Sequence, residues 1–305
     1  MVQPARKGVI PPQPRPQRER TPRSVIIRRR LIAFGVLLAA LIVLFFAIAG
    51  LPGGGGKKTE TQPLVPTKPF RIVFPEGFTR REMAERITAV DKIAKRERGA
   101  QPLLSAPAYL RLTKNPRLIP LGFRPARRLE GFLFPATYEF TVSTPTRRLV
   151  ISQLQAFRRN WRRLNLAYAR SKNLTPYDVL IIASMIEKEA FAPEERGKVA
   201  RVIYNRLHAR MPLGIDATIR YGLDIPPTKS LTDSELNSNS PYNTRTRPGL
   251  TPTPIANPGL ASLQAAAHPR GGCWLYFVRK PDKKHHFFTC SERDFENYKI
   301  AHGYK

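Results

Sequence analysis

The apolar segment VLIIASMI, residues 179–186, constrains the fold of this 305-residue chain more than any other feature. On a helical wheel its side chains cover nearly the whole circumference, as in a helix that is buried on every side. Thr175 and Pro176 are usual start signals for such a helix. Because a helix without a polar face needs other elements around it, residues 176–189 are predicted to lie at the centre of a domain core.

Three charged residues, Glu187, Lys188 and Glu189, follow this segment directly. On the wheel Glu189 lies beside apolar side chains of the helix, and Glu187 lies on the opposite side. Desolvation should raise the pKa of Glu189, and a carboxylic acid protonated near neutral pH can act as a general acid in glycoside cleavage. The plainer alternative is a helix end whose glutamates are exposed, or are salt-bridged to Lys188 or Arg196.

The spacing of the other acids gives no obvious second carboxylate to work with Glu189, although most glycosidases use two. One type of glycoside cleavage needs only one carboxyl. If a hydroxyl of the sugar itself attacks, neither an enzyme nucleophile nor an activated water is required.

The N-terminal region predicts a membrane anchor. Residues 1–30 hold nine Lys/Arg and one acid in a Pro/Gln/Arg-rich composition, which indicates a disordered basic cytoplasmic tail. Residues 31–51 are predicted as a transmembrane helix, because their uncharged run is long enough to cross a hydrocarbon core of about 30 Å. The preceding arginines place the N-terminus in the cytoplasm and the rest of the chain outside. A cleaved signal peptide is the alternative, because Ala-Ile-Ala at 47–49 resembles a cleavage site.

The exported part remains strongly basic, with 43 Lys/Arg and 21 Asp/Glu, a surplus of +22 out of a net charge of +30. Outside a membrane the available polyanions are lipid head groups, wall polymers and peptidoglycan carboxylates, so no nucleic-acid partner is expected. A basic surface that is merely solvated is the alternative.

Two cysteines, Cys273 and Cys290, lie in the exported part and could pair in an oxidising compartment, although the sequence does not prove the pairing. His285 and His286 are close to them in the sequence. No known ligand spacing is matched, so neither a metal nor a cofactor is predicted.

The remaining pattern predicts a mixed α+β fold. Residues 52–69 have the composition of a flexible linker. Residues 70–74 are predicted as a strand, and a capping box of Thr79 and Glu82 as the start of a helix that continues to about Arg96. Further helices are expected over 144–172, over 175–189, over 193–210 and, as the last helix, over 259–267, opened by Asn257 and Pro258. Residues 214–223 are expected in loops, and 274–280 and 285–291 as two closing strands. The predicted boundaries separate a small module with its connector at 70–128 from a larger α+β domain at 129–305.

Six blocks carry a family resemblance: LEGFLFPATYEF, ASMIEKEA, RVIYNRL, DATIRYGL, SPYNTRTRPGL and PIANPGLASLQAAAHP. Their order and spacing over about residues 70–295 resemble the endolytic murein transglycosylases, the YceG-like or MltG family. The resemblance implies a lytic transglycosylase of the cell membrane with its catalytic domain outside. Such an enzyme cuts peptidoglycan strands between N-acetylmuramic acid and N-acetylglucosamine, leaves 1,6-anhydro ends and terminates nascent strands. A LysM-like module at 70–128 and penicillin-binding proteins as partners are also implied.

The same resemblance implies that Glu189 is catalytic and that Glu187 supports it. The residues implied to bind glycan are Glu130, Tyr138, Asn205, Arg206, Asp216, Thr218, Tyr221, Ser240, Tyr242, Asn243 and Asn257. Arg245 stands where relatives commonly have an aromatic residue.

Plainer roles compete with glycan contact at several of these positions. The side chains of Asn205 and Asn243 can cap or bridge loops, those of Tyr221 and Tyr242 can pack, and that of Asp216 can be a helix N-cap. For the whole protein, the alternative is a non-catalytic wall-binding scaffold for the synthesis machinery. The intact acid at Glu189 favours the enzyme.

Overall fold

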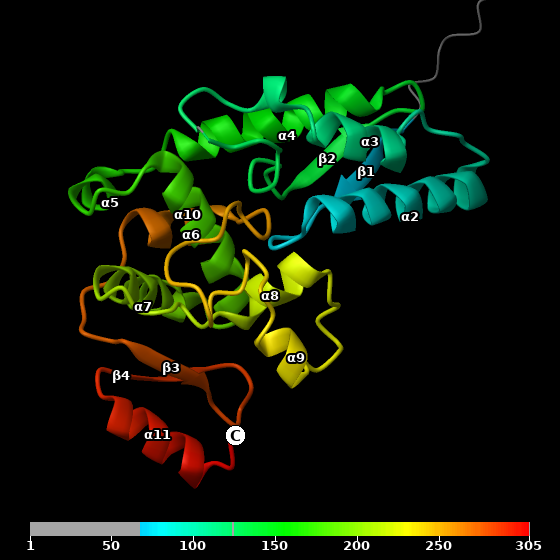
Figure 1. The fold of residues 1–305 in the computed structure, drawn as a ribbon. Coiled ribbons are helices and arrows are strands. Elements are labelled where there is room, and N and C mark those ends of the chain that lie inside the picture. Colours follow the sequence, from blue (N-terminus) through cyan, green and yellow to red (C-terminus); the bar gives the residue numbers. More distant parts are fainter. Residues whose placement is uncertain (1–67, 124, 305) are drawn as a thin grey trace, which may run out of the picture. The chain divides into compact units, whose positions relative to one another are not determined.

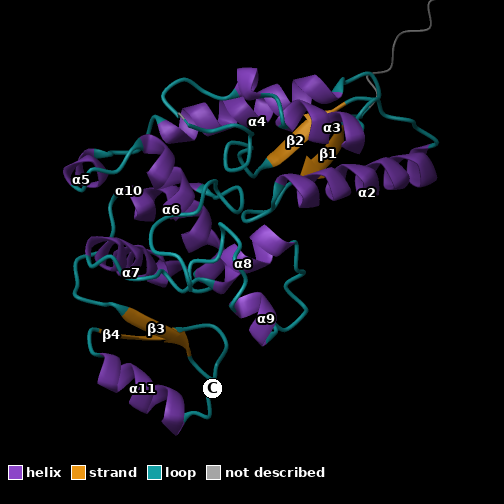
Figure 2. Cartoon of the chain, in the orientation of Figure 1, coloured by secondary structure: helices purple, strands orange, loops and turns teal. Residues whose placement is uncertain are grey.

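The computed structural model describes residues 68–123 and 125–304, in which many helices are combined with two small sheets (Figures 1 and 2). This confirms the predicted α+β class. The predicted tail, transmembrane helix and nearly all of the linker lie outside the described residues. Within the described ranges, no helix has the length and apolarity needed to span a bilayer.

Helix α6, Pro176–Glu189, lies at the centre of the core, as predicted (Figure 1). Thr175 and Asp178 form a capping box at its start, and every residue from 179 to 186 is buried. Its neighbours are α7 (Arg196–His208), α8 (Asp216–Leu223) and α10 (Leu260–Ala267). Ser184, within the buried run, accepts a hydrogen bond of 3.0 Å from the backbone N–H of Ile255. The prediction of a helix buried on every side is confirmed.

The N-terminal part of the described chain forms a two-stranded antiparallel sheet with helices beside it. Strand β1 (Phe70–Val73) pairs with β2 (Thr137–Phe140), so Phe70 lies opposite Phe140. The expected capping box of Thr79 and Glu82 starts helix α2. The helical segments here are α2 (Arg80–Arg98), α3 (Ala106–Thr113), a 3-10 turn at Pro116–Leu118 and α4 (Thr146–Trp161). Because β1 pairs with β2, this sheet crosses the predicted boundary between residues 128 and 129, and that boundary stays a prediction.

The C-terminal part contains the two predicted closing strands, β3 (Tyr276–Arg279) and β4 (His286–Thr289), in an antiparallel pair. Helix α11, Glu292–Ala301, packs on both strands (Figure 1). The sequence interpretation missed this helix, although Ser291 caps it by accepting a hydrogen bond from the backbone of Asp294. A disulfide joins Cys273 to Cys290.

The helix predicted over 144–172 is wrong as a single helix, because α4 ends at Trp161 and α5 covers only Ala167–Ser171. Asparagine side chains at both ends of the break bond to the backbone. Asn160 donates to the Ala156 carbonyl, and Asn165 accepts from the Ala167 N–H. Such bonds compete with continued helix.

Three further predictions are corrected in the middle of the chain. Residues 214–223 were expected in loops but form most of α8, and a short helix α9 covers Asp233–Leu236. Asp216 is the first residue of α8 and Ile215 is its N-cap, so the N-cap role for Asp216 is wrong. Helix α10 (Leu260–Ala267) agrees with the predicted 259–267, but its N-cap is Gly259 and not Asn257, because the Asn257 side chain bonds elsewhere in the fold.

Candidate active site

Glu189 is the last residue of α6, and its side chain is partly accessible while the turns behind it are buried. Burial raises the pKa of its carboxyl from 4.5 to about 7, and the negative charge of Asp216 adds to that rise. The charges of Arg279 and Arg245 and the backbone N–H of Ala217 act in the opposite direction. This carboxyl therefore loses its proton near neutral pH, with groups nearby that stabilise the ionised form.

Asp216 and Arg245 form an ion pair beside this carboxyl, with Arg245 Nε 2.7 Å from Asp216 Oδ1. Asp216 and Ala217 are the first two residues of α8, so the positive end of that helix faces Glu189. Arg245 thus places a cation beside Asp216 in this chain. That cation offsets the charge of Asp216.

A buried threonine pair fixes the start of α8. Thr244 Oγ1 accepts from the Ile215 N–H at 3.0 Å and lies 3.0 Å from Thr218 Oγ1. The Thr244 carbonyl accepts from the Gly214 N–H at 2.9 Å. The loop that carries Arg245 is therefore attached to the helix that carries Asp216.

The same loop is stabilised by three of the residues implied to bind glycan. Asn243 is buried, donates to the carbonyls of Leu236 and Ser238, and accepts from the Arg245 N–H. Ser240 accepts from the Tyr242 N–H. The hydroxyls of Tyr242 and Thr253 lie 2.9 Å apart. These contacts hold Arg245 in place, which is the bridging role that the sequence left open for Asn243.

Glu130 and Asn257 lie together in the interior. Burial raises the pKa of Glu130, and the charge of Arg80 opposes the rise. Glu130 accepts hydrogen bonds of 2.9–3.0 Å from the Arg80 backbone, the Asn257 amide and the Tyr221 hydroxyl. Asn257 also accepts from the Leu133 N–H. This network joins α2, α8 and the segment before α10, so it stabilises the position of α8, which carries Asp216.

Glu187 faces a different environment from Glu189. Its Oε2 accepts a 2.8 Å hydrogen bond from the Gly259 N–H at the start of α10, and its Oε1 lies 4.0 Å from Arg196 Nη2. Burial raises the pKa of the nearby Glu76, and the negative charge of Glu187 adds to that rise. The plainer alternative, a salt bridge to Arg196, therefore describes Glu187 and not Glu189.

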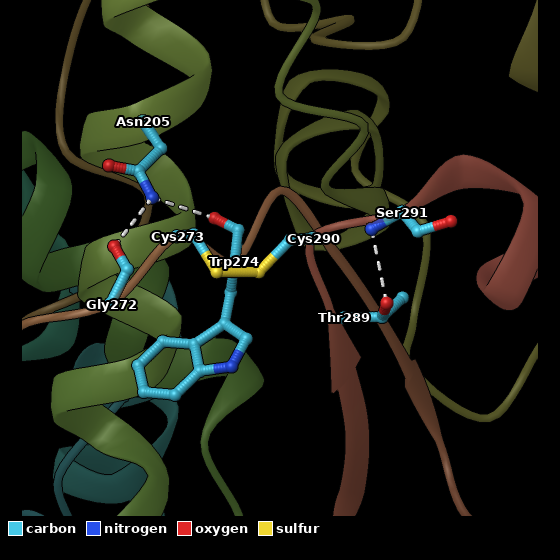
Figure 3. Close-up of a disulfide and its surroundings, with 7 residues drawn as sticks. All are labelled: Asn205, Gly272, Cys273, Trp274, Thr289, Cys290 and Ser291. Carbon is cyan, nitrogen blue, oxygen red and sulfur yellow. Dashed lines mark hydrogen bonds between the residues drawn. A yellow bond between two sulfur atoms is a disulfide. The ribbon is translucent and has the colours of Figure 1, made fainter.

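Asn205 and Arg206 attach the closing strands to α7. Asn205 donates to the carbonyls of Gly272 and Trp274, which flank the disulfide residue Cys273 (Figure 3). Arg206 donates to the carbonyls of Leu275, Pro212 and Leu213. On β2, Tyr138 donates to the Phe134 carbonyl.

Eight of the eleven residues implied to bind glycan therefore fall into three groups, and Asn205, Arg206 and Tyr138 lie outside them. Asp216 lies near Glu189. Thr218, Ser240, Tyr242 and Asn243 form hydrogen bonds at the start of α8 or within the loop that carries Arg245. Glu130, Tyr221 and Asn257 form the buried network behind the site. Direct contact of any of them with glycan stays a prediction.

The sequence interpretation missed two neighbours of Glu189, Arg279 and Phe191. The Arg279 guanidinium lies 4.2 Å from the centre of the Phe191 ring. The only local signal for Arg279 was the Arg-Lys pair that ends the predicted closing strand WLYFVRK, and nothing local could place that strand next to α6.

A depression of about 560 Å³ lies between α5 and α7. It is lined in part by Leu174, just before the start of α6, and so lies toward the opposite end of that helix from Glu189. Within residues 68–123 and 125–304, no three His, Cys, Asp or Glu side chains are grouped so as to hold a metal ion. Glu189 combines a raised pKa with charged neighbours of both signs, and its catalytic role stays a prediction.

Comparison with known proteins places these features in a family. The YceG-like family model matches residues 57–299. The endolytic murein transglycosylase of Streptococcus pneumoniae (strain ATCC BAA-255 / R6) is 31% identical over 263 residues, which cover 81% of this chain and 46% of that protein. The endolytic murein transglycosylase of Bacillus subtilis (strain 168) is 38% identical over 152 residues, which cover 50% of this chain and 42% of that protein.

The fold comparison agrees with the sequence comparison. A crystal structure of a YceG-like protein from Listeria monocytogenes matches with a TM-score of 0.60 and 27% identity over 75% of each chain. The chain spans less than half the length of each of these two curated relatives. Since the family model covers most of the chain and a solved relative shares its fold, this chain belongs to the YceG-like family.

Proposed function

We propose that this protein is an endolytic lytic transglycosylase that cleaves the bond between N-acetylmuramic acid and N-acetylglucosamine in peptidoglycan strands. The observation that carries the proposal is the carboxyl of Glu189, which ends a buried helix and has a pKa of about 7. Two relatives with the name endolytic murein transglycosylase support the choice of substrate.

In the proposed reaction, protonated Glu189 donates its proton to the glycosidic oxygen as that bond breaks. The ionised Glu189 then takes the proton from the C6 hydroxyl of the same muramic acid, whose oxygen bonds to C1. The products are a 1,6-anhydro end and a free N-acetylglucosamine hydroxyl, and no water is consumed. Arg279, Arg245 and the Ala217 N–H stabilise the carboxylate between the two proton transfers.

Asp216 supports one competing reaction, because it is a second carboxylate near Glu189. Two carboxylates can orient a water molecule and hydrolyse the same bond, which would leave a reducing end. The ion pair with Arg245 at 2.7 Å opposes this role, since it keeps Asp216 compensated rather than free to activate water.

Mass spectrometry of digested glycan strands tests the proposal. The wild type should produce 1,6-anhydro ends, and Glu189→Gln should not. Reducing ends in place of anhydro ends would show hydrolysis. Binding without any cleavage by the wild type would favour the scaffold alternative.

The cellular location is part of the same proposal. A single-pass anchor at 31–51, with the catalytic domain outside the membrane, agrees with the uncharged run in the sequence. The Cys273–Cys290 disulfide supports an oxidising compartment. Retention in membranes after a high-salt wash tests the anchor, and a soluble form that starts near Gly50 would favour a cleaved signal peptide.

Protein partners and strand termination come from the resemblance. A membrane enzyme that cuts strands internally would act beside the penicillin-binding proteins that polymerise them. Crosslinking in intact cells tests for that partner, and longer glycan strands in a strain that lacks the protein would support strand termination.

A further inference from the structure

Phe191 is a large apolar side chain on the surface beside the proposed catalytic acid. It follows Glu189 by two residues, and 56% of its surface is exposed. Helix α6 has already ended there, and Ala190 has an extended conformation. Exposure leaves most of the free energy available from burying a phenyl ring unused, so packing alone gives no account of an aromatic residue at this position.

Arg279, the last residue of β3, covers one face of this ring at 4.2 Å. Its side chain is exposed and forms no hydrogen bond or ion pair with any other residue that the structure describes. A guanidinium carries five N–H donors in one plane. Beside Glu189, this cation therefore has donors available for acceptor atoms of a ligand.

A buried clamp holds Phe191 and Arg279 together. Glu195 accepts a 3.0 Å hydrogen bond from the His286 N–H and lies 2.7 Å from His286 Nδ1, and both side chains are buried. His286 lies directly opposite Arg279 in the β3–β4 register. Glu195 is close to Phe191 in sequence, in the 3-10 turn Pro193–Glu195. The clamp therefore fixes the strand that carries Arg279 to the segment that carries Phe191.

We propose that Phe191 and Arg279 form a carbohydrate subsite next to Glu189. The apolar C–H face of an N-acetylated hexose would stack on the ring face that Arg279 leaves uncovered. The negative face of an aromatic ring attracts such hydrogens. The guanidinium donates hydrogen bonds to hydroxyl or N-acetyl oxygens of the same sugar or its neighbour. The subsite rests on the proposed function, because it presents a sugar to Glu189.

Binding is measured in the Glu189→Gln background, where no cleavage competes. Full-length protein in detergent is titrated with soluble, uncrosslinked glycan strands. Adding Phe191→Ala should raise the Kd about tenfold, as expected for the loss of one aromatic stack. Arg279→Gln should raise the Kd several-fold, and Arg279→Lys should restore only part of that loss because it keeps the charge without the planar donors.

Arg98 provides the matched control, since its guanidinium lies 4.4 Å from the Phe70 ring in another part of the fold. Arg98→Gln should leave the Kd unchanged. A second measurement, in enzyme with Glu189 intact, should show that Phe191→Ala raises KM while kcat changes less than twofold.

The outcomes separate the subsite from the activity. Unchanged Kd and KM in Phe191→Ala, with melting temperatures equal to the parent protein, would overturn the subsite while leaving the activity in place. If the wild type cleaves no glycan but the Kd still depends on Phe191 and Arg279, the proposed function fails and the subsite stands as a binding site.

Discussion

Glu187 and Glu189 lie two residues apart on one helix, yet their environments are opposite. Glu187 is fixed by the Gly259 N–H at 2.8 Å and by Arg196 at 4.0 Å. Glu189 is desolvated, and the charges around it have both signs, so its pKa is about 7. One carboxylate is bonded into the fold at the start of α10, and the other can exchange a proton. The difference arises because successive residues of a helix point in different directions, and α10 and α8 lie against different faces of α6.

The largest expected effect separates the two glutamates by activity. Glu189→Gln should lower kcat by about 100- to 10,000-fold, because both proton transfers lose their agent. Glu187→Gln should keep far more activity, since its carboxyl only holds the helix end. The rate of 1,6-anhydro end formation measures both variants. Full activity in Glu189→Gln together with an inactive Glu187→Gln would exchange the roles.

The second effect separates the two glutamates by how the free energy of unfolding depends on pH. The folded-state pKa of Glu189 is raised from 4.5 to about 7. The native state therefore favours protonated Glu189. Its contribution to the free energy of unfolding is complete below about pH 4.5 and is lost as the pH rises through 7. At 1.36 kcal/mol per pKa unit the loss is at most about 3 kcal/mol, and partial solvent access reduces it to roughly 1–2 kcal/mol.

Glu189→Gln should therefore unfold at a higher temperature than the wild type at pH 8, and the gain should shrink by pH 5. Thermal denaturation at the two pH values measures this difference. Equal melting temperatures at pH 8 would show that Glu189 is not desolvated in solution.

The third effect is the stability cost at Glu187. Glu187→Gln replaces a charged acceptor by a neutral one and leaves Arg196 without its nearest anion. A charge-assisted hydrogen bond contributes about 1.5–3 kcal/mol, so the variant should lose part of that amount. Chemical denaturation at pH 7 measures the loss, and Glu97→Gln, the same substitution in an exposed ion pair on α2, serves as control. A Glu187→Gln protein as stable as the wild type would show that the bond to α10 contributes little.

Local patterns predicted the central helix and its acid because both depend on short-range rules. Residues 179–186 have no polar face, and Thr175 with Pro176 marks the helix start, so the buried α6 could be inferred without a partner. The placement of Glu189 beside apolar turns also predicted its raised pKa.

The rest of the site depends on long-range contacts that no local pattern carries. Arg279 lies near Glu189 in part because Glu195 binds His286, 91 residues away in the sequence, and Arg279 pairs with His286 across the hairpin. Asn257 looked like a helix start, but its amide donates a hydrogen bond to the carboxylate of Glu130, 127 residues away in the sequence. Helix α11 was missed because the closing strands appeared to end the domain.

The smallest expected effect concerns Arg245, which lies near Glu189 and pairs with Asp216. Only protonated Glu189 can donate, so activity should fall as the pH rises through about 7. Arg245→Gln removes a cation that lowers the pKa of Glu189 and releases Asp216, whose charge raises it, so both changes act in the same direction. The alkaline limb of kcat against pH should therefore move to higher pH, and this shift is read from the shape of the profile, independently of any change in kcat at pH 5. Arg71→Gln is the control, since it breaks an exposed ion pair with Glu139 on β2. A limb that stays in place, or moves to lower pH, would show that the Asp216–Arg245 pair does not set the pKa of Glu189.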